Sequence, residues 1–204
     1  MRRPRVFLDV DGVLADFLTA SIPILNDLTG KTWVEGDFKT WDIFETVPKL
    51  FEQIFFDAVN KVGWCRSLPA YEAALIGVPP LVESTDLFIV TSPMNHVPTW
   101  TYEREGWLHE HFGIHHKRVV HTSAKFLCIG DVLVDDRPSN IEAWEAEHPG
   151  GLGLLWDQPY NRTSTAGVRV STWKQVQFVA SMMTGSVDDH YLFVDELRNG
   201  KRSW

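Results

Sequence analysis

Five short β-rich runs, separated by helical patterns, restrict the fold of this chain more than any other feature of its sequence. Each run places Val, Leu, Ile or Phe at neighbouring positions, which is typical of strands buried on both faces. Strands that alternate with helices form a mainly parallel sheet covered by helices. We therefore expect an α/β fold with a parallel sheet. The five predicted strands are Arg5–Val10, Asp86–Thr91, Lys117–His121, Asp131–Asp135 and Gly151–Trp156.

Helical patterns fill most of the intervals between these strands. Proline begins one of them, and glycine follows two others, as is common at helix ends. The tail after Gly185 shows no clear period and is left unassigned. The predicted helices in this part of the chain are 97–112, 138–148 and about 173–183.

Residues 16–82 interrupt the alternation directly after the first strand. They contain helical patterns near 16–28 and 48–61, joined by an aromatic loop. We expect a small helical lobe that stands over the strand ends. The predicted domains are an α/β core of residues 1–15 and 83–204 and a cap of residues 16–82.

Charge and composition exclude several classes of function. The 204 residues carry a net charge of −8, which argues against binding to a nucleic-acid polymer. No run of about 18 apolar residues occurs, so we expect no membrane span. Two cysteines without a C-x-x-C spacing indicate free thiols in a reducing compartment, and we expect a cytoplasmic protein.

Polar residues follow the predicted strands at their carboxyl ends, where parallel sheets bind ligands. Taken singly, each has an ordinary explanation: Asp and Gly form turns, and a lone lysine is usually solvated. Together they predict one site, because adjacent carboxylates at a buried strand end need compensation by a cation or by hydrogen bonds. The four features are Asp9-Val10-Asp11-Gly12, Thr91-Ser92, Lys125 and Asp135-Asp136.

These residue types are suited to phosphoryl transfer. The carboxylate of Asp9 can attack phosphorus, and Asp11 can protonate the leaving oxygen. Lys125 can stabilise the charge of the transition state. Mg²⁺ prefers hard oxygen ligands, which Asp9, Asp136 and the carbonyl of Asp11 can supply.

In this order, the motifs resemble the haloacid dehalogenase (HAD) superfamily of phosphotransferases. Over roughly residues 5 to 160 the chain is most similar to the 5′(3′)-deoxyribonucleotidases within it. The stretches that carry the resemblance are Asp9–Phe17, Thr91–Pro93, Tyr102–Gly113 and Gly130–Pro138.

The resemblance implies a Rossmann-like core with a helical cap and a nucleoside monophosphatase activity. Asp9 would be the nucleophile, and Asp11 would act first as general acid and then as general base. Mg²⁺ would be held by Asp9, Asp11 and Asp136, with Asp135 in support. Phosphate would be bound by Thr91, Ser92 and Lys125, and the nucleobase by cap residues. The candidate base-binding residues are Trp41, Asp42, Ile43 and Trp64.

The chain departs from this family at two positions. Ser123 stands two residues before Lys125, where the family often has arginine. Arg104 stands where the family tends to have lysine, and we expect it to compensate by binding phosphate.

Three alternatives stay open. The enzyme could act on another small phosphoester, such as a sugar phosphate, or the scaffold could serve a non-catalytic nucleotide-binding protein. A haloacid dehalogenase is disfavoured, because that chemistry does not use Asp11. The expected partner is a small nucleotide, and a homodimer is left open. His109 and His111 lie two apart on a predicted helix and face different directions, so they do not indicate a metal site.

Overall fold

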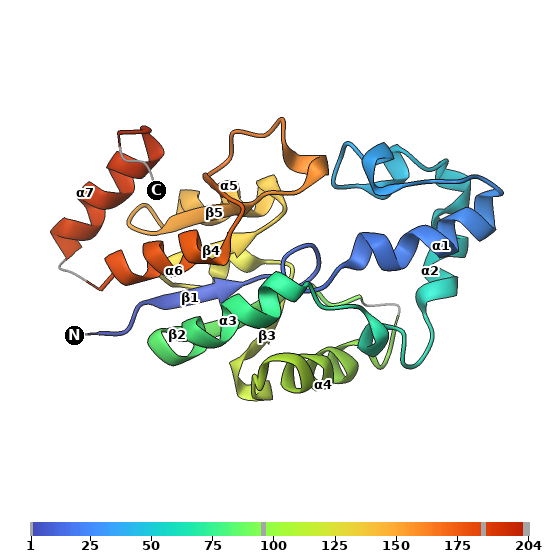
Figure 1. Cartoon of the computed structure of the whole chain (residues 1–204), viewed down its shortest axis with the longest axis horizontal. Helices are drawn as coiled ribbons and strands as arrows, with labels where there is room; N and C mark the ends of the chain where they lie inside the picture. Colours follow the sequence, from blue (N-terminus) through green and yellow to red (C-terminus); the bar gives the residue numbers. More distant parts are fainter. Residues whose placement is uncertain (1, 95–96, 185–186, 202–204) are drawn as a thin grey trace.

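A six-stranded sheet in which every paired strand runs parallel forms the centre of the protein (Figure 1). The computed structural model describes residues 2–94, 97–184 and 187–201. The strand order β3-β2-β1-β4-β5-β6 places the first strand in the middle of the sheet. The strands are β1 (Arg5–Leu8), β2 (Asp86–Thr91), β3 (Val119–His121), β4 (Val132–Asp135), β5 (Leu152–Trp156) and β6 (Val168–Val170).

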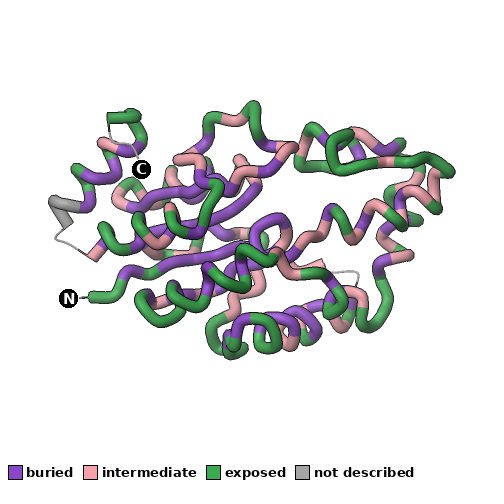
Figure 2. The backbone as a smooth tube through the Cα atoms, in the orientation of Figure 1, coloured by how far each residue is buried: buried purple, intermediate pink, exposed green. Residues whose placement is uncertain are grey.

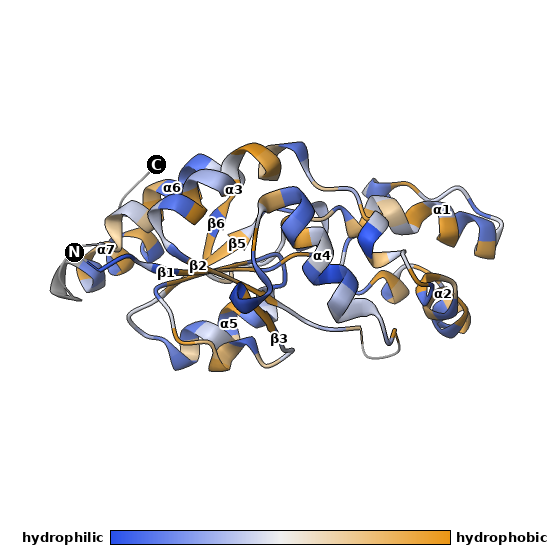
Figure 3. Cartoon of the chain, turned by 90° about the horizontal axis from the view of Figure 1, so that it is seen from below, coloured by the Kyte–Doolittle hydropathy of each residue, from blue (hydrophilic) through white to orange (hydrophobic). Residues whose placement is uncertain are grey.

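Helices cover both faces of this sheet, as the edge-on view in Figure 3 shows. The α-helices are α1 (Phe17–Thr29), α2 (Glu52–Val59), α3 (Glu72–Ser84), α4 (Trp100–Phe112), α5 (Pro138–Glu147), α6 (Trp173–Met182) and α7 (Val187–Arg198). Short 3₁₀ turns are η1 (Glu35–Asp37), η2 (Ile43–Glu45), η3 (Lys49–Phe51), η4 (Cys65–Ser67), η5 (His116–Arg118), η6 (Lys125–Leu127) and η7 (Pro159–Asn161).

The two faces of the sheet have separate apolar cores. Val6 and Leu8 of β1 point to the face covered by α3, α4 and α6, whereas Phe7 points to the face covered by α5. Successive strand side chains alternate between faces, so a strand covered on both sides must be apolar throughout. Figure 2 shows this as continuous burial along the central strands.

The segment between β1 and α3 forms a helical cap beyond the carboxyl ends of the strands (Figure 1). It has its own apolar cluster, centred on Leu25, Phe38, Phe44 and Phe55. Phe17, Trp64 and Met94 pack against both this cluster and the main core, so the cap has its own apolar centre and also an apolar contact with the core.

The two chain segments that join the cap to the core are bound to each other, and we call them the stalk (residues 14–16 and 69–71). Ala15 and Ala70 form an isolated antiparallel bridge. The N–H of Asp16 donates to the carbonyl of Pro69 at 2.9 Å, and the N–H of Tyr71 donates to the carbonyl of Leu14 at 2.9 Å. The chain therefore leaves the core and returns to it at nearly the same point.

Helix α3 lies on the sheet and not in the cap. Gly77 packs against the ring of Trp173 of α6, and the Gln177 side-chain amide donates to the Gly77 carbonyl at 2.9 Å. The predicted cap range of 16–82 therefore differs from the structure, in which the cap ends at the stalk. A cap boundary drawn from pattern alone missed this helix because Pro79 and Pro80 lie inside it.

The five predicted strands and five predicted helical regions all have counterparts. The structure adds β6 at the sheet edge, α3, and α7 in the tail that carried no assignment. Among the described helices, none has both the length and the apolar character of a membrane span.

Candidate active site

The loop after β1 carries Asp9 and Asp11 and turns tightly into the cap. The N–H groups of Val13, Leu14 and Ala15 all donate to the carbonyl of Val10. Gly12 has φ +79°, and a Cβ placed there would lie 2.3 Å from Oδ2 of Asp136. Only glycine fits, both because of this backbone conformation and because the loop touches a carboxylate.

Lys125 joins two of the buried carboxylates. Its Nζ lies 2.8 Å from Oδ1 of Asp9 and donates at 2.7 Å to Oδ2 of Asp135. The lysine is 2% exposed and belongs to η6, which follows β3. Residues that follow three different strands therefore meet at one point, as expected at the carboxyl edge of a parallel sheet.

Both carboxylate oxygens of Asp135 accept hydrogen bonds from neighbouring groups of the protein. Its Oδ1 accepts from the N–H of Arg137 at 2.8 Å, and the side-chain amide of Asn140 donates to its Oδ2 at 3.0 Å. With Lys125 also bound, this carboxylate is held in place. The supporting role that the resemblance implies for Asp135 stays a prediction.

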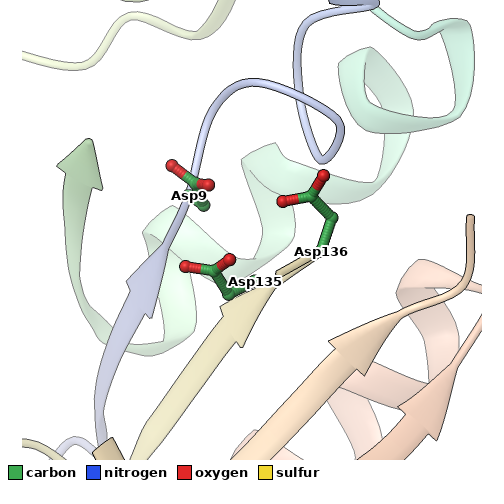
Figure 4. Close-up of side chains that lie close together, drawn as sticks. All are labelled: Asp9, Asp135 and Asp136. Carbon is green, nitrogen blue, oxygen red and sulfur yellow. The ribbon is translucent and has the colours of Figure 1, made fainter. Parts of the chain in front are cut away.

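Asp136 is buried and only half paired. The hydroxyl of Tyr160 donates to its Oδ2, while its Oδ1 has no hydrogen-bond partner among the described residues. One carboxylate oxygen each of Asp9, Asp135 and Asp136 lies within 4.8 Å of the others (Figure 4). An orphaned buried carboxylate oxygen beside two further carboxylates is a cradle for a cation.

The electrostatics of this cluster point the same way. Burial, with a further contribution from Asp135 and against the pull of Lys125, raises the pKa of Asp9 to about 7. Burial and the neighbouring carboxylates also hold the pKa of Asp136 well above its ordinary value. Three carboxylates face one ammonium group, so the ionised cluster has an excess of negative charge that a divalent cation would offset. The donors are hard oxygens, which fit Mg²⁺.

Arg104, the predicted phosphate-binding residue of α4, contacts Asp11. One nitrogen, Nη2, donates to Oδ1 of Asp11 at 2.7 Å and to Oδ2 at 2.8 Å. The guanidinium is fully buried and does not line the cavity described below. The predicted phosphate-binding residue Arg104 is therefore paired with Asp11 and is not exposed to the cavity.

Thr91 and Ser92 lie where the sequence predicted, at the end of β2. Both line the cavity, as does Ser123. The Thr91 hydroxyl is buried and has no hydrogen-bond partner within the described ranges. A buried, unpaired hydroxyl beside the carboxylates is available to a ligand.

A cavity of about 490 Å³ lies above the carboxylates and is lined on its far side by residues of the cap. Asp9, Lys125 and Asp136 form its floor. The predicted base-binding residues Trp41, Asp42 and Ile43 all line it. Apolar and aromatic cap residues complete the roof: Phe17, Leu18, Phe38, Phe44, Phe55 and Phe56.

The two tryptophans predicted to bind a base lie in different environments. Trp41 is 46% exposed, and the guanidinium carbon of Arg137 lies 3.9 Å from the centre of its ring. The ring of Trp64 packs between the rings of Phe17 and Trp100, with distances between ring centres of 5.4 Å and 6.1 Å. It does not line the cavity.

Three polar residues around the carboxylates were not singled out from the sequence: Tyr160, Arg137 and Asn140. Tyr160 lies in η7, four residues beyond the end of β5, so a search of the loop after β5 at the carboxyl edge of the sheet could have found it. Arg137 and Asn140 follow Asp136 within one helical turn. Only the φ and the contact of Gly12 reveal its role.

Solved structures with a similar fold include hydrolases of the HAD superfamily. A HAD family hydrolase from Deinococcus radiodurans, solved with bound phosphate and sodium, matches 90% of this chain and 98% of its own at a TM-score of 0.56 and 16% identity. A HAD-superfamily hydrolase from Geobacter sulfurreducens matches 87% of this chain and 96% of its own, with a TM-score of 0.50 and 16% identity. The fold is that of the HAD hydrolases.

The family within this class follows from the sequence. Residues 3–184 match the model of the family described as 5′ nucleotidase, deoxy (pyrimidine), cytosolic type C protein, and the chain belongs to that family. The protein is thus a phosphoric monoester hydrolase. A 5′(3′)-deoxyribonucleotidase of Bacillus subtilis is 27% identical over 176 residues, covering 84% of this chain and 95% of its own. One from Clostridium acetobutylicum is 22% identical over 178 residues, covering 87% and 94%.

Proposed function

We propose that the protein hydrolyses (deoxy)nucleoside monophosphates to nucleoside and phosphate, with Mg²⁺ as cofactor and Asp9 as nucleophile. The observation that carries the proposal is the ion pair between Asp9 and Lys125 on the floor of a cavity roofed by aromatic cap residues. The carboxylate nucleophile suits the phosphate of a nucleotide, and the aromatic roof suits its base. Two relatives, whose matches to this chain span nearly their whole length, are named 5′(3′)-deoxyribonucleotidases.

In the first step, an oxygen of the Asp9 carboxylate attacks phosphorus. A bond forms between this oxygen and phosphorus, and the bond from phosphorus to the nucleoside oxygen breaks. Asp11, two residues further on the same loop, donates the proton that the leaving oxygen needs. Lys125 orients Asp9 through the 2.8 Å contact and stabilises the negative charge of the transition state.

In the second step, water attacks the phosphorus of the aspartyl phosphate. Asp11, now deprotonated, accepts a proton from that water, and the bond between phosphorus and the Asp9 oxygen breaks. Phosphate leaves, and both aspartates return to their starting protonation states. The cycle consumes one water and needs no oxidant or second substrate.

Mg²⁺ would be held by carboxylate oxygens of Asp9 and Asp136 and by the carbonyl of Asp11. The orphaned Oδ1 of Asp136 supports this assignment. When bound, the cation offsets the repulsion between the carboxylates and the phosphate dianion. Asp135 is committed to Lys125, Arg137 and Asn140, and so it would support the site without binding the metal.

The substrate's two ends would meet different walls of the cavity. Thr91, Ser92 and Lys125 would bind the phosphate, and Trp41, Asp42 and Ile43 would contact the base. A volume of about 490 Å³ is within the range of small-molecule sites, and aromatic walls with a few polar groups are typical of them. We further expect a cytoplasmic protein, with which the free thiols of Cys65 and Cys128 agree.

The test is a panel of nucleoside monophosphates and sugar phosphates, assayed with Mg²⁺ and with a chelator. We expect Mg²⁺-dependent release of phosphate from nucleotides and loss of turnover in Asp9→Asn, with the fold retained in thermal unfolding. Asp27→Asn, an exposed aspartate of α1, is the matched control and should keep full activity.

Three results would contradict parts of the proposal. Substantial turnover by Asp9→Asn would exclude Asp9 as nucleophile. A clear preference for sugar phosphates would contradict the proposed substrate class but would leave the proposed reaction mechanism unchanged. No phosphate release from any substrate would favour the non-catalytic alternative.

A further inference from the structure

We propose that Arg104 is a positioning residue that fixes the carboxylate of Asp11 for proton transfer, and that it does not contact the phosphate. The inference rests on the proposed function, because it assigns Asp11 the role of general acid. It replaces the expectation from sequence that Arg104 binds phosphate. The contacts, the burial and the surroundings of the guanidinium each support it.

The contact between the two side chains is direct and involves both carboxylate oxygens. Nη2 of Arg104 lies 2.7 Å from Oδ1 of Asp11 and 2.8 Å from Oδ2. A single donor shared by both oxygens restricts rotation of the carboxylate about its last bond. Asp11 itself lines the cavity, so the fixed carboxylate faces the space where a leaving group would lie.

Among the described residues, Asp11 is the one carboxylate that forms a close ion pair with the guanidinium, and Asp9 adds an attraction from further away. Its Nε and Nη1 are buried without a hydrogen-bond partner there. The rings of Trp100 and Trp107 lie 5.0 and 5.7 Å from its central carbon, within the range of cation–π contacts. When Asp11 is ionised, as it is after the first step, the buried guanidinium holds its carboxylate firmly, because separation would leave this ion pair broken away from water.

Burial separates this role from phosphate binding. Arg104 is 0% exposed and absent from the cavity wall, whereas the side chain of Asp11 is 30% exposed. A ligand in the cavity meets Asp11 and not the guanidinium behind it. Arg104 can therefore act on the reaction only through Asp11.

Hydrogen bonds anchor helix α4, which carries Arg104. Its neighbour Glu103 accepts hydrogen bonds from the Thr99 hydroxyl at 2.6 Å and from the N–H of Gly63 at 2.8 Å. Helix α4 is thus tied to the turn before the stalk, and Arg104 inherits that fixed position. A proton donor must lie within hydrogen-bond reach of the leaving oxygen, so the helix contributes to catalysis by holding Asp11 still.

The test exploits leaving groups that differ in their need for a proton. A nucleoside leaves as an alcohol and must be protonated, whereas p-nitrophenolate leaves without a proton. In Arg104→Lys, we expect kcat/KM for a nucleoside monophosphate to fall about tenfold, a fraction of what general acid catalysis supplies. For p-nitrophenyl phosphate, kcat/KM should change less than about twofold, since it reports steps up to the loss of the leaving group.

Two further measurements separate positioning from phosphate binding. Inhibition by inorganic phosphate should be the same in Arg104→Lys and in the wild type. In an Asp11→Asn background, which lacks the general acid, Arg104→Lys should cause no further loss of kcat/KM for the nucleotide. Asp11→Asn alone should show the same dependence on the leaving group.

Arg66→Lys is the matched control, since Arg66 is an exposed arginine paired with Glu110 outside the cavity. It should leave both substrates unaffected. If Arg104→Lys does not fold in thermal unfolding, Arg104→Gln takes its place, because its amide keeps one donor for Asp11, and the same dependence is expected.

The inference is overturned by an equal loss on both substrates, by weaker inhibition by phosphate, or by losses that add in the double variant. Failure of the proposed function looks different: the wild type would then release no phosphate from either ester, and Asp9→Asn would match it.

Discussion

Gly12 is the residue on which the shape of the catalytic loop depends most directly. It has φ +79° and lies against Asp136, so it meets two separate requirements for glycine. Asp9 and Asp11 flank the same turn, and a shift of this glycine would move both carboxylates relative to the carboxylates of β4.

The two requirements can be separated by a pair of alanine substitutions. Gly30 has φ +66° with no atom within 4 Å of a built Cβ, so Gly30→Ala should cost only the backbone strain, about 1 kcal/mol. Gly12→Ala adds the clash with Asp136 and should destabilise the protein further and remove activity. Urea unfolding and phosphate release measure the two effects. Equal losses of stability, with activity kept in Gly12→Ala, would contradict this interpretation.

The positions of single site residues could be predicted where they follow directly from the carboxyl ends of the strands. Lys125 meets Asp9 and Asp135 because parallel strands bring their carboxyl ends together. The pairing of Arg104 with Asp11 was not predictable. It depends on which face of α4 is buried, and the sequence of α4 has little amphipathic pattern because aromatic and charged residues alternate around it.

Among the elements, the cap loop around η2 supplies the part of the cavity wall to which the proposed function assigns base recognition. Trp41 precedes η2 and contacts Arg137, the residue before α5, so the cap and the core meet across the cavity at this pair. Trp64, next to η4, is a packing residue between the cap and α4. Two tryptophans of the same lobe should therefore respond differently to substitution.

Trp41→Ala should raise KM for nucleotides and alter the preference among bases with little change in stability, because nearly half of its surface is exposed. Trp64→Ala should instead lower the free energy of unfolding by about 3 kcal/mol, the usual cost of removing a packed aromatic side chain. Kinetics on a nucleotide series and urea unfolding of both variants provide the test. The idea fails if Trp41→Ala is the more destabilised variant or if Trp64→Ala alone changes base preference.

At the same scale, the strands could be predicted better than the cap boundary. Runs such as Val132–Val134 are apolar because both faces of the sheet are covered, and this pattern is visible in the sequence. Strand β6 has three residues at the edge of the sheet and so leaves little pattern. Helix α3 contains Pro79 and Pro80, which usually end helices, so its place on the sheet became visible only through its packing against α6.

Viewed as a whole molecule, the protein concentrates buried acidic charge at one edge of an already acidic chain. Its net charge is −8, and three of its carboxylates share a buried cluster with one lysine. Repulsion within that cluster opposes folding unless a cation is bound. Stability and cofactor binding should therefore be coupled.

Mg²⁺ should raise the unfolding temperature of the wild type, by an amount equivalent to about 2.7 kcal/mol at a hundredfold excess over its Kd. Asp136→Asn should abolish this dependence and, in the presence of a chelator, should be more stable than the wild type. Thermal unfolding at a series of Mg²⁺ concentrations measures both, with Asp27→Asn as the control that retains the dependence. An unchanged response to Mg²⁺ in Asp136→Asn would exclude Asp136 as a ligand.

The stalk has a consequence for how such an enzyme can be altered. Because Ala15 and Ala70 pair and the backbone bonds of Asp16 and Tyr71 close the same point, the segment between them is an insert whose backbone leaves and re-enters the core at one place. A different insert that begins and ends with the same paired backbone leaves the strand register, Asp9 and Lys125 untouched. With base recognition assigned to the cap, as under the proposed function, recognition and reaction lie in different segments of one chain, and we expect a transplanted cap to bring a new substrate to the same chemistry.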